Sequence, residues 1–380
     1  MKPIFSFLVL FFAVETTAQT HFTIPQNVWR ITINTDYSSG NWKTNNLQNT
    51  PMKHYYPIYT KVYSLNQYYK RITATNKIDF EYGFTDRATL VFQIPYINKI
   101  AEERSWSLLN DSSSVILDSL FNLYYPPTIA NSGLSDLTIG MNILLKGSPA
   151  WRGGKQKFSL YSGLEMKFPF AERLKKYDPD DKGIDGIPNQ FKQVPLGDGL
   201  TEIKLKFFGE FYRKKWGRLF NINWKVGVSS FQKAQVNPRI TFLWIQNASA
   251  DSIANSIGNV IQKKPLKLSG MISAQIELVP KKVFFTTGAD WTFSGREKFF
   301  SSSSEWSEWM TKHKGYDSRF MYSSQFVKVN LFNLDPYFMV GPVPFELEIG
   351  ARWFLPYPFT FNTYGNISSW LQISTYLQAW

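Results

Sequence analysis

The sequence predicts an all-β fold, an antiparallel up-and-down barrel of about 12 strands that crosses a membrane. Three observations lead to this prediction. Runs of about ten residues alternate between apolar and polar side chains, as in strands whose two faces meet different surroundings. Aromatic residues make up 17% of the chain, which suits the interfacial girdles of a membrane barrel. The connections between the runs alternate between long and short, as in barrels with long extracellular loops and short periplasmic turns.

The clearest strand pair lies at residues 77–97. In its first run Ile78 and Phe80 share one face, whereas Asp79 and Glu81 share the other. The connection to the second run is short enough only for a hairpin. The apolar face would point into the core of a secreted sandwich, but toward lipid in a membrane barrel. The sorting of long and short connections favours the barrel, because a sandwich has no reason to separate them.

The first 18 residues are typical of a secretory signal peptide. Lys2 supplies the positive start, residues 4–14 the apolar core, and residues 16–18 the small-residue cleavage region. We therefore predict a signal peptide at 1–18, rather than a short strand or anchor, and a single barrel domain at 19–380. The chain has no cysteine, which excludes a disulfide-stapled scaffold. Because no later apolar run approaches the roughly 20 residues of a membrane helix, insertion would use strands.

The other predicted strands follow the opening hairpin's pattern, and glycine, proline and polar residues mark their connections. They are residues 28–37, 133–146, 157–169, 199–212, 219–230, 266–279, 283–293, 320–332, 344–355 and 368–380. The long connections are residues 38–70, 98–132, 170–197, 231–265 and 294–318, which we expect to be loops. In the last strand Leu371, Ile373 and Leu377 are out of phase with Trp380. We expect either a bulge between them or a lumen-facing Trp380.

The alternation also assigns side chains to the two faces. Residues expected to face lipid include Leu137, Ile139, Met141, Ile143, Phe158, Leu160, Leu164 and Met166. The candidates expected to line the lumen are Lys77, Asp79, Glu81, Lys146, Lys157, Glu165, Lys204, Lys206, Glu210, Lys225, Glu277, Asp290, Glu346, Glu348 and Arg352. Both signs of charge are well represented, unlike the one-signed ring of a selective ion pore. The net charge of +13 must then reside mainly in loops and turns.

Five of the carboxylates lie near the short turns, namely Glu81, Glu210, Glu277, Glu346 and Glu348. The alternation of side chains along their strands points all five inward. Each buried charge without a partner would cost several kcal/mol. We therefore expect a belt of acid–base pairs there, with Lys146 and Lys157 at the same level, that braces the barrel and narrows or plugs its lower mouth. On this view, Glu210→Gln or Glu277→Gln would strand a lysine.

Two segments resemble recurring phrases of the outer-membrane family named for the meta-pathway of phenol degradation. They are residues 82–87, YGFTDR, followed by Pro95-Tyr96, and residues 132–140, SGLSDLTIG. The resemblance covers residues 77–212 and continues beyond them only in architecture. It implies a barrel similar to the channels for fatty acids and other hydrophobic compounds, and passive transport. It assigns no catalytic or cargo-binding residue, because the matched phrases are turns and strands.

The sequence offers little for catalysis or metal binding. Phospholipase barrels, which resemble this chain in strand number, use a His and a Ser near each other on one strand. The three histidines, His21, His54 and His313, all fall outside the predicted strands, so we predict no enzyme and no cofactor. Residues 177–189 hold three weak calcium candidates, Asp178, Asp180 and Asp185. They lack EF-hand spacing, so an ordinary polar loop is the preferred interpretation.

The sequence therefore predicts a monomeric barrel of a Gram-negative outer membrane. Its expected function is passive passage or binding of a small apolar or aromatic compound. The alternative is a structural or surface barrel whose lumen is closed by salt bridges. The expected partners are outer-membrane lipids, lipopolysaccharide, the barrel-assembly machinery and a small apolar cargo. A secreted chain is not expected to meet nucleic acid, despite its basic charge.

Overall fold

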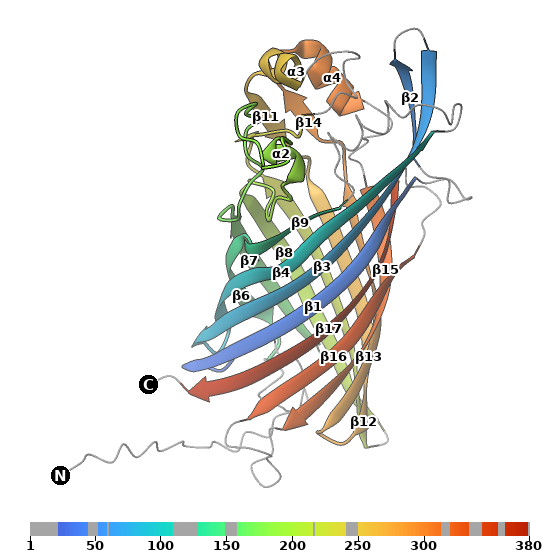
Figure 1. Cartoon of the computed structure of the whole chain (residues 1–380). Helices are drawn as coiled ribbons and strands as arrows, with labels where there is room; N and C mark the ends of the chain where they lie inside the picture. Colours follow the sequence, from blue (N-terminus) through green and yellow to red (C-terminus); the bar gives the residue numbers. More distant parts are fainter. Residues whose placement is uncertain are drawn as a thin grey trace, which may run out of the picture.

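The main body of the protein is a closed antiparallel barrel of 12 strands (Figure 1). The computed structural model describes residues 22–44, 52–58, 61–108, 128–148, 158–215, 217–240, 250–312, 320–333, 344–355 and 362–378. The barrel strands are β1 (Val28–Thr44), β3 (Lys61–Thr85), β4 (Ala88–Leu108), β6 (Leu137–Lys146), β7 (Phe158–Phe168), β8 (Glu202–Lys215), β9 (Arg218–Phe231), β12 (Lys267–Val279), β13 (Val283–Ser294), β15 (Phe320–Asn333), β16 (Phe345–Leu355) and β17 (Asn362–Gln378). The predicted fold class is confirmed, whereas the predicted signal peptide at 1–18 lies outside the described residues.

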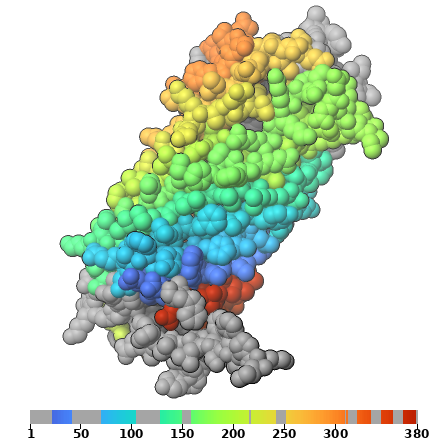
Figure 2. All heavy atoms as spheres, turned by 90° about the vertical axis from the view of Figure 1, so that its left-hand side faces the viewer, coloured from blue at the N-terminus to red at the C-terminus, as the bar shows by residue number. Residues whose placement is uncertain are grey.

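Strand β1 closes the barrel, because it pairs with β3 on one side and β17 on the other. Closure gives each barrel strand two neighbours, so the backbone groups facing lipid are paired within the sheet. The colours run in diagonal bands across one wall, which shows that the strands are tilted (Figure 2). Strand β1 pairs with β17 without a break, from Val28 opposite Gln378 to Thr44 opposite Asn362, so the described part of β17 has no bulge. Trp380 lies outside the described residues.

The two ends of the barrel differ as the sequence predicts. The tight connections after β3, β8 and β12 lie at one end, which we call the short-turn end, and the helices lie at the other, the long-loop end (Figure 1). Above the barrel, β10 (Ala234–Val236), β11 (Val260–Lys263) and β14 (Lys298–Phe300) form a small separate sheet. Helices α3 (Ala250–Ile257) and α4 (Ser304–Lys312) lie beside it, and α2 (Asn189–Lys192) belongs to the loop before β8. None of the described helices is long and apolar enough to cross a membrane.

Two of the long segments predicted to be loops contain strands. Between residues 38 and 70, β1 continues to Thr44, and β2 (Met52–Ile58) forms a hairpin with the start of β3. Between residues 98 and 132, β4 continues to Leu108 and pairs with β5 (Thr128–Leu134). These extensions pass beyond the wall of 12 strands. Backbone hydrogen bonding supports a strand even where apolar and polar side chains do not alternate, so the sequence pattern missed these extensions.

The outer surface of the barrel is apolar, which is the reverse of a soluble protein. The residues expected to face lipid are exposed or half-buried, with Ile139 48% and Leu164 52% exposed. On the opposite face of the same strands, Ser159 and Asn142 are buried. The arrangement matches a barrel whose exterior contacts lipid.

An arginine on this outer face should destabilise the barrel. We expect Ile139→Arg to lower the free energy of unfolding in lipid vesicles by about 2–4 kcal/mol if the site lies near the bilayer midplane. The matched control is Ile184→Arg, because Ile184 is fully exposed in the loop before β8 and should change by less than about 0.5 kcal/mol. Equal stability of the two variants in a denaturant titration would contradict a lipid-facing Ile139.

Candidate functional site

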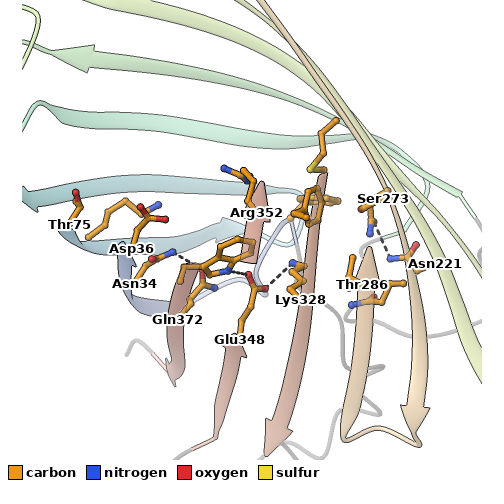
Figure 3. Close-up of a pocket in the computed structure, with 17 residues that line it drawn as sticks. Asn34, Asp36, Thr75, Asn221, Ser273, Thr286, Lys328, Glu348, Arg352 and Gln372 are labelled. Carbon is orange, nitrogen blue, oxygen red and sulfur yellow. Dashed lines mark hydrogen bonds and ion pairs between the residues drawn. The ribbon is translucent and has the colours of Figure 1, made fainter. Parts of the chain in front are cut away.

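A cavity of about 520 Å³ lies inside the barrel (Figure 3). In the close-up, Asn34 and Asp36 stand on one side, Asn221 and Thr286 on the other, and Arg352 between them. Polar side chains dominate the lining, with Asn34, Asp36, Thr75, Lys77, Asn221, Asn223, Ser273, Gln275, Thr286, Lys328, Glu348, Arg352 and Gln372. The apolar lining consists of Phe22, Met271, Phe326 and Trp370. The site therefore suits a molecule that carries polar groups.

Residues 22–27, which we call the N-terminal plug, bind the barrel wall at the short-turn end. The amide of Ile24 donates a hydrogen bond to Thr89 Oγ1 at 2.9 Å, and the amide of Asn27 donates to the Gly83 carbonyl at 2.9 Å. Ile24 is 1% exposed, so its side chain is fully buried by the contact. The plug has no alternation that would mark a strand, and sequence reasoning did not assign it a role.

Phe22 joins the plug to an apolar cluster inside the barrel, made of Leu144, Tyr161 and Phe208. Its ring centroid lies 5.3 Å from that of Tyr161 and 4.8 Å from that of Phe208. Because Phe22 also lines the cavity, this cluster lies between the cavity and the plug.

A second inward-facing cluster lies at the same end and is made of Tyr212, Leu219, Phe284 and Phe332. The two clusters together fill this part of the lumen with apolar side chains, in the way that a small barrel fills its own interior. The expectation of a lower mouth narrowed mainly by acid–base pairs is therefore wrong for this part of the lumen.

Glu81 and Glu348, two carboxylates of the expected belt, have charged partners. Glu81 accepts a hydrogen bond from Arg30 Nη2 at 2.8 Å and a second from Arg30 Nε, so the pair is bidentate. Glu348 pairs with Lys328 at 2.8 Å. Arg30 was not a candidate, although it lies on the opposite face of β1 from exposed Ile33 and could have been found by parity.

A buried polar network surrounds the Glu348–Lys328 pair. Asn330 Nδ2 donates to Glu346 Oε1 and to Glu348 Oε2, each at 2.8 Å. Trp370 Nε1 donates to the other oxygen of Glu348 at 2.8 Å. Glu346 is 1% exposed, and the positive charge of Arg30 acts on it. Neutral donors, the Asn330 amide and the Trp370 indole, therefore contribute to this network beside the charged groups.

Glu210 and Glu277 depart from the expected pairing. Glu210 is buried and accepts a hydrogen bond from the Tyr161 hydroxyl at 2.9 Å. Glu277 accepts from the backbone amides of Leu219 at 2.8 Å and Lys281 at 2.6 Å. The expectation that changing either to Gln would strand a lysine is therefore wrong. The turn supplies amide donors and the apolar cluster supplies a hydroxyl, which parity alone does not reveal.

The two lysines expected to complete the belt do not contribute to it among the described residues. Lys146 is exposed, because the pairing of β6 with β7 shifts register between Leu144 and Lys146. Lys157 lies outside the described residues. Lys146 joins exposed Arg87, Lys214 and Lys281 at the short-turn end, where part of the excess positive charge is found.

The remaining candidates lie higher in the barrel. Lys77 pairs with Asp79 at 2.9 Å, and Arg352 pairs with Asp290 at 3.2 Å. The Arg352 guanidinium lies over the rings of Phe326 and Trp370, at 5.9 and 5.5 Å from their centroids. Three candidates, Lys77, Glu348 and Arg352, line the cavity.

Another group of candidates lies on the wall of β7, β8 and β9. Glu165 pairs with Lys206 and, at 3.7 Å, with Lys204. Lys225 lies beside them on β9. The register between β8 and β9 brings these side chains together, and their grouping was not apparent from the sequence.

The loop between β7 and β8 covers part of the inner wall at the long-loop end. Its residues Ala171, Val194 and Leu196 pack on three isoleucines of β4 and β5, Ile97, Ile100 and Ile129. This contact packs the loop against the wall at that end of the barrel.

Asp198 fastens the same loop to the wall. Burial alone would raise the pKa of its carboxyl, but Lys264 at 2.9 Å and Lys167 at 3.2 Å outweigh burial and hold that pKa below its usual range. The ion pairs of Asp198 with the two lysines are therefore fully formed at neutral pH, and they are lost as the pH falls through the lowered pKa of Asp198.

The weak calcium candidates do not converge on a common point. Asp178 accepts a hydrogen bond from the Asp180 amide at 2.9 Å, and Asp185 is ion-paired with Lys192. Within the described residues, no three His, Cys, Asp or Glu side chains are placed to hold a metal ion. His54 lies in strand β2 and not in a loop as expected, while His21 and His313 lie outside the described residues.

Comparison with known proteins supports the barrel fold. No protein-family model matches the sequence, and no curated protein matches it. An outer membrane channel from Pseudomonas putida F1 is 12% identical with a TM-score of 0.50, over 93% of this chain and 97% of that one. The translocator domain of autotransporter NalP from Neisseria meningitidis is 9% identical with a TM-score of 0.39, over 91% and 88%. The Pseudomonas putida toluene transporter TodX is 6% identical with a TM-score of 0.37, over 92% and 90%. The first likeness shows a shared fold, and the other two are too distant to add to it.

Proposed function

We propose that the chain is an outer-membrane channel that binds a small amphipathic molecule in its lumen and is closed at the short-turn end by the N-terminal plug. The observation that carries the proposal is the cavity of about 520 Å³ directly above Phe22 of the plug. A lumen filled throughout by side chains would have no such space. The volume lies within the range of small-molecule sites, about 300–1,000 Å³.

The lining narrows the expected cargo. An apolar or aromatic compound, as the sequence resemblance implies, would contact Phe22, Met271, Phe326 and Trp370. The remaining lining is polar and would leave unsatisfied groups around a pure hydrocarbon. We therefore favour a cargo with an aromatic or apolar body and at least one polar group.

The proposed orientation follows the long and short connections. The long-loop end would face the outside with its lipopolysaccharide, and the short-turn end would face the periplasm. Removal of residues 1–18 would make Gln19 the first residue, just before the plug, so the plug would enter from the periplasmic side. The chain would be assembled by the barrel-assembly machinery, act as a monomer and have no enzymatic activity.

A second function is favoured by the closed lower lumen. If the plug and the two apolar clusters never separate, the protein would be a structural or surface barrel that transports nothing. The two hypotheses differ in whether the plug moves.

A disulfide can test this movement cleanly, because the chain has no cysteine. We expect Ile24→Cys combined with Thr89→Cys to crosslink the plug, since the Ile24 amide lies 2.9 Å from Thr89 Oγ1. In planar bilayers the oxidised protein should stay closed, and reductant should restore opening events. Each single-cysteine variant is the matched control and should be insensitive to reductant.

The outcome separates the two functions. Opening that appears only after reduction supports a channel gated by the plug. Conductance through the oxidised, fully crosslinked protein would show that the plug is not the gate. Absence of conductance in the wild-type and reduced proteins would favour the structural barrel.

A further inference from the structure

Three lysines gather on the inner wall next to the cavity with only one carboxylate among them. In the pairing of β8 with β9, Lys225 lies opposite Phe208, and Lys206 lies opposite Gly227. Lys204 lies one step further along the same wall. Glu165 on β7 is shared by Lys206 and Lys204. Glu165 therefore has to balance more positive charge than one carboxylate carries.

Lys225 is the lysine left without a close partner among the described residues. Glu165 attracts it from a distance, whereas Lys206, Lys204 and Lys77 all repel it. Its side chain is only partly exposed, so water screens this repulsion less than at an open surface. A group of like charges at a partly enclosed site is stabilised by an anion that binds between them.

Two glycines set the positions of the neighbouring lysine stems. A Cβ atom added at Gly163 would lie 2.3 Å from Lys206 Cε, and one added at Gly227 would lie 3.3 Å from Lys204 Cε. The stems of Lys206 and Lys204 thus lie across glycines of adjacent strands, close to the wall. This arrangement keeps the two lysine stems at the wall.

Lys77 on β3 lines the cavity. Lys225 lies next to two residues that line it, Asn223, two residues earlier on β9, and Met271, its partner on β12. A molecule whose anionic group binds at Lys225 would extend its remaining part into the cavity, where the rings of Phe326 and Trp370 supply apolar contacts.

We infer that Lys225, with Lys204 and Lys77 near it, forms an anion-binding subsite of the lumen, and that the ligand is a small organic carboxylate with an apolar or aromatic body. The inference rests on the proposed function, because it names the chemical class of the cargo. Lys225 donates to the carboxylate, Lys204 and Lys77 add to its attraction, and the cavity holds the rest of the molecule.

Benzoate and benzamide test the charge requirement, because they share a ring and differ in charge. In calorimetric titrations of the purified full chain, we expect benzoate to bind about tenfold tighter than benzamide. Lys225→Gln should abolish this preference, and Lys225→Arg should retain it. Lys281→Gln is the control, because Lys281 is an exposed lysine on the turn after β12 and should leave both affinities unchanged. The preference should also shrink as the salt concentration rises.

The results distinguish this inference from the proposed function. Equal binding of the two probes, or a benzoate preference that survives Lys225→Gln, would overturn the anion subsite while leaving the cavity as a binding site. Failure of both probes to bind any variant would count against the subsite and the proposed function together. Should Lys225→Gln fail to fold, Lys204→Gln supplies the second test, with the same loss of preference expected in smaller degree.

Discussion

Replacing Gly83 with alanine is expected to displace the N-terminal plug and raise the conductance of the short-turn end. A Cβ atom at residue 83 would lie 1.9 Å from the Pro25 carbonyl oxygen and 2.8 Å from the Ile24 carbonyl oxygen. Both are backbone atoms that cannot rotate away, so the plug must move. The movement would break the hydrogen bond from the Asn27 amide to the Gly83 carbonyl. It would also expose Ile24, at a cost of about 1.5–3 kcal/mol.

The measurement is single-channel conductance of Gly83→Ala beside wild type in planar bilayers. Gly295→Ala is the control, since Gly295 follows the end of β13 at the long-loop end. A Cβ atom there meets the Pro265 side chain at 3.3 Å and no backbone atom within 4 Å. Folding of each variant should be checked by heat-modifiable gel mobility. A folded Gly83→Ala protein with wild-type conductance would show that the plug does not close the channel.

The sequence could predict the barrel because strand alternation is local. Ile139 and Leu164 are exposed on the outer face, as their phase requires, and the sorting of short turns and long loops needs no knowledge of the tertiary structure. The extensions of β1 and β4 beyond the wall were missed, since apolar and polar residues do not alternate regularly along them.

The plug could not be predicted in the same way. Its contacts join residues 22–27 to Gly83 and Thr89, which are far away in the chain, and no periodic pattern connects them. One signal was present, because Gly83 follows Asp79 and Glu81 on the inward face of β3. A glycine inside a strand often marks the close approach of another backbone.

The sequence predicts which side chains face the lumen, but not which groups they contact there. Parity places Glu81, Glu210 and Glu277 inside the barrel, but the height and neighbour of each depend on the register between strands. Register gives Glu210 the hydroxyl of Tyr161 and gives Glu277 two backbone amides. It gives Glu81 an arginine from β1, the strand that closes the barrel.

We expect Arg30→Gln to destabilise the barrel strongly. Arg30 is 7% exposed and forms two hydrogen bonds with Glu81, while its charge also acts on buried Glu346. Glutamine cannot supply the charge, so two carboxylates would remain in a poorly hydrated interior. Breaking a buried pair in this way costs about 3–5 kcal/mol, which should appear as a lower midpoint in denaturant unfolding.

An exposed pair provides the control for this prediction. Lys70 and Glu103 lie 3.1 Å apart with side chains 42% and 47% exposed, so Lys70→Gln should cost no more than about 1 kcal/mol. Adding Glu81→Gln to Arg30→Gln should recover part of the loss, since the charge of Glu81 is then removed. The recovery separates the cost of a stranded charge from the loss of arginine packing. If Arg30→Gln costs no more than Lys70→Gln, or if the double variant is no more stable than Arg30→Gln, then the Arg30–Glu81 pair does not brace the closure of the barrel.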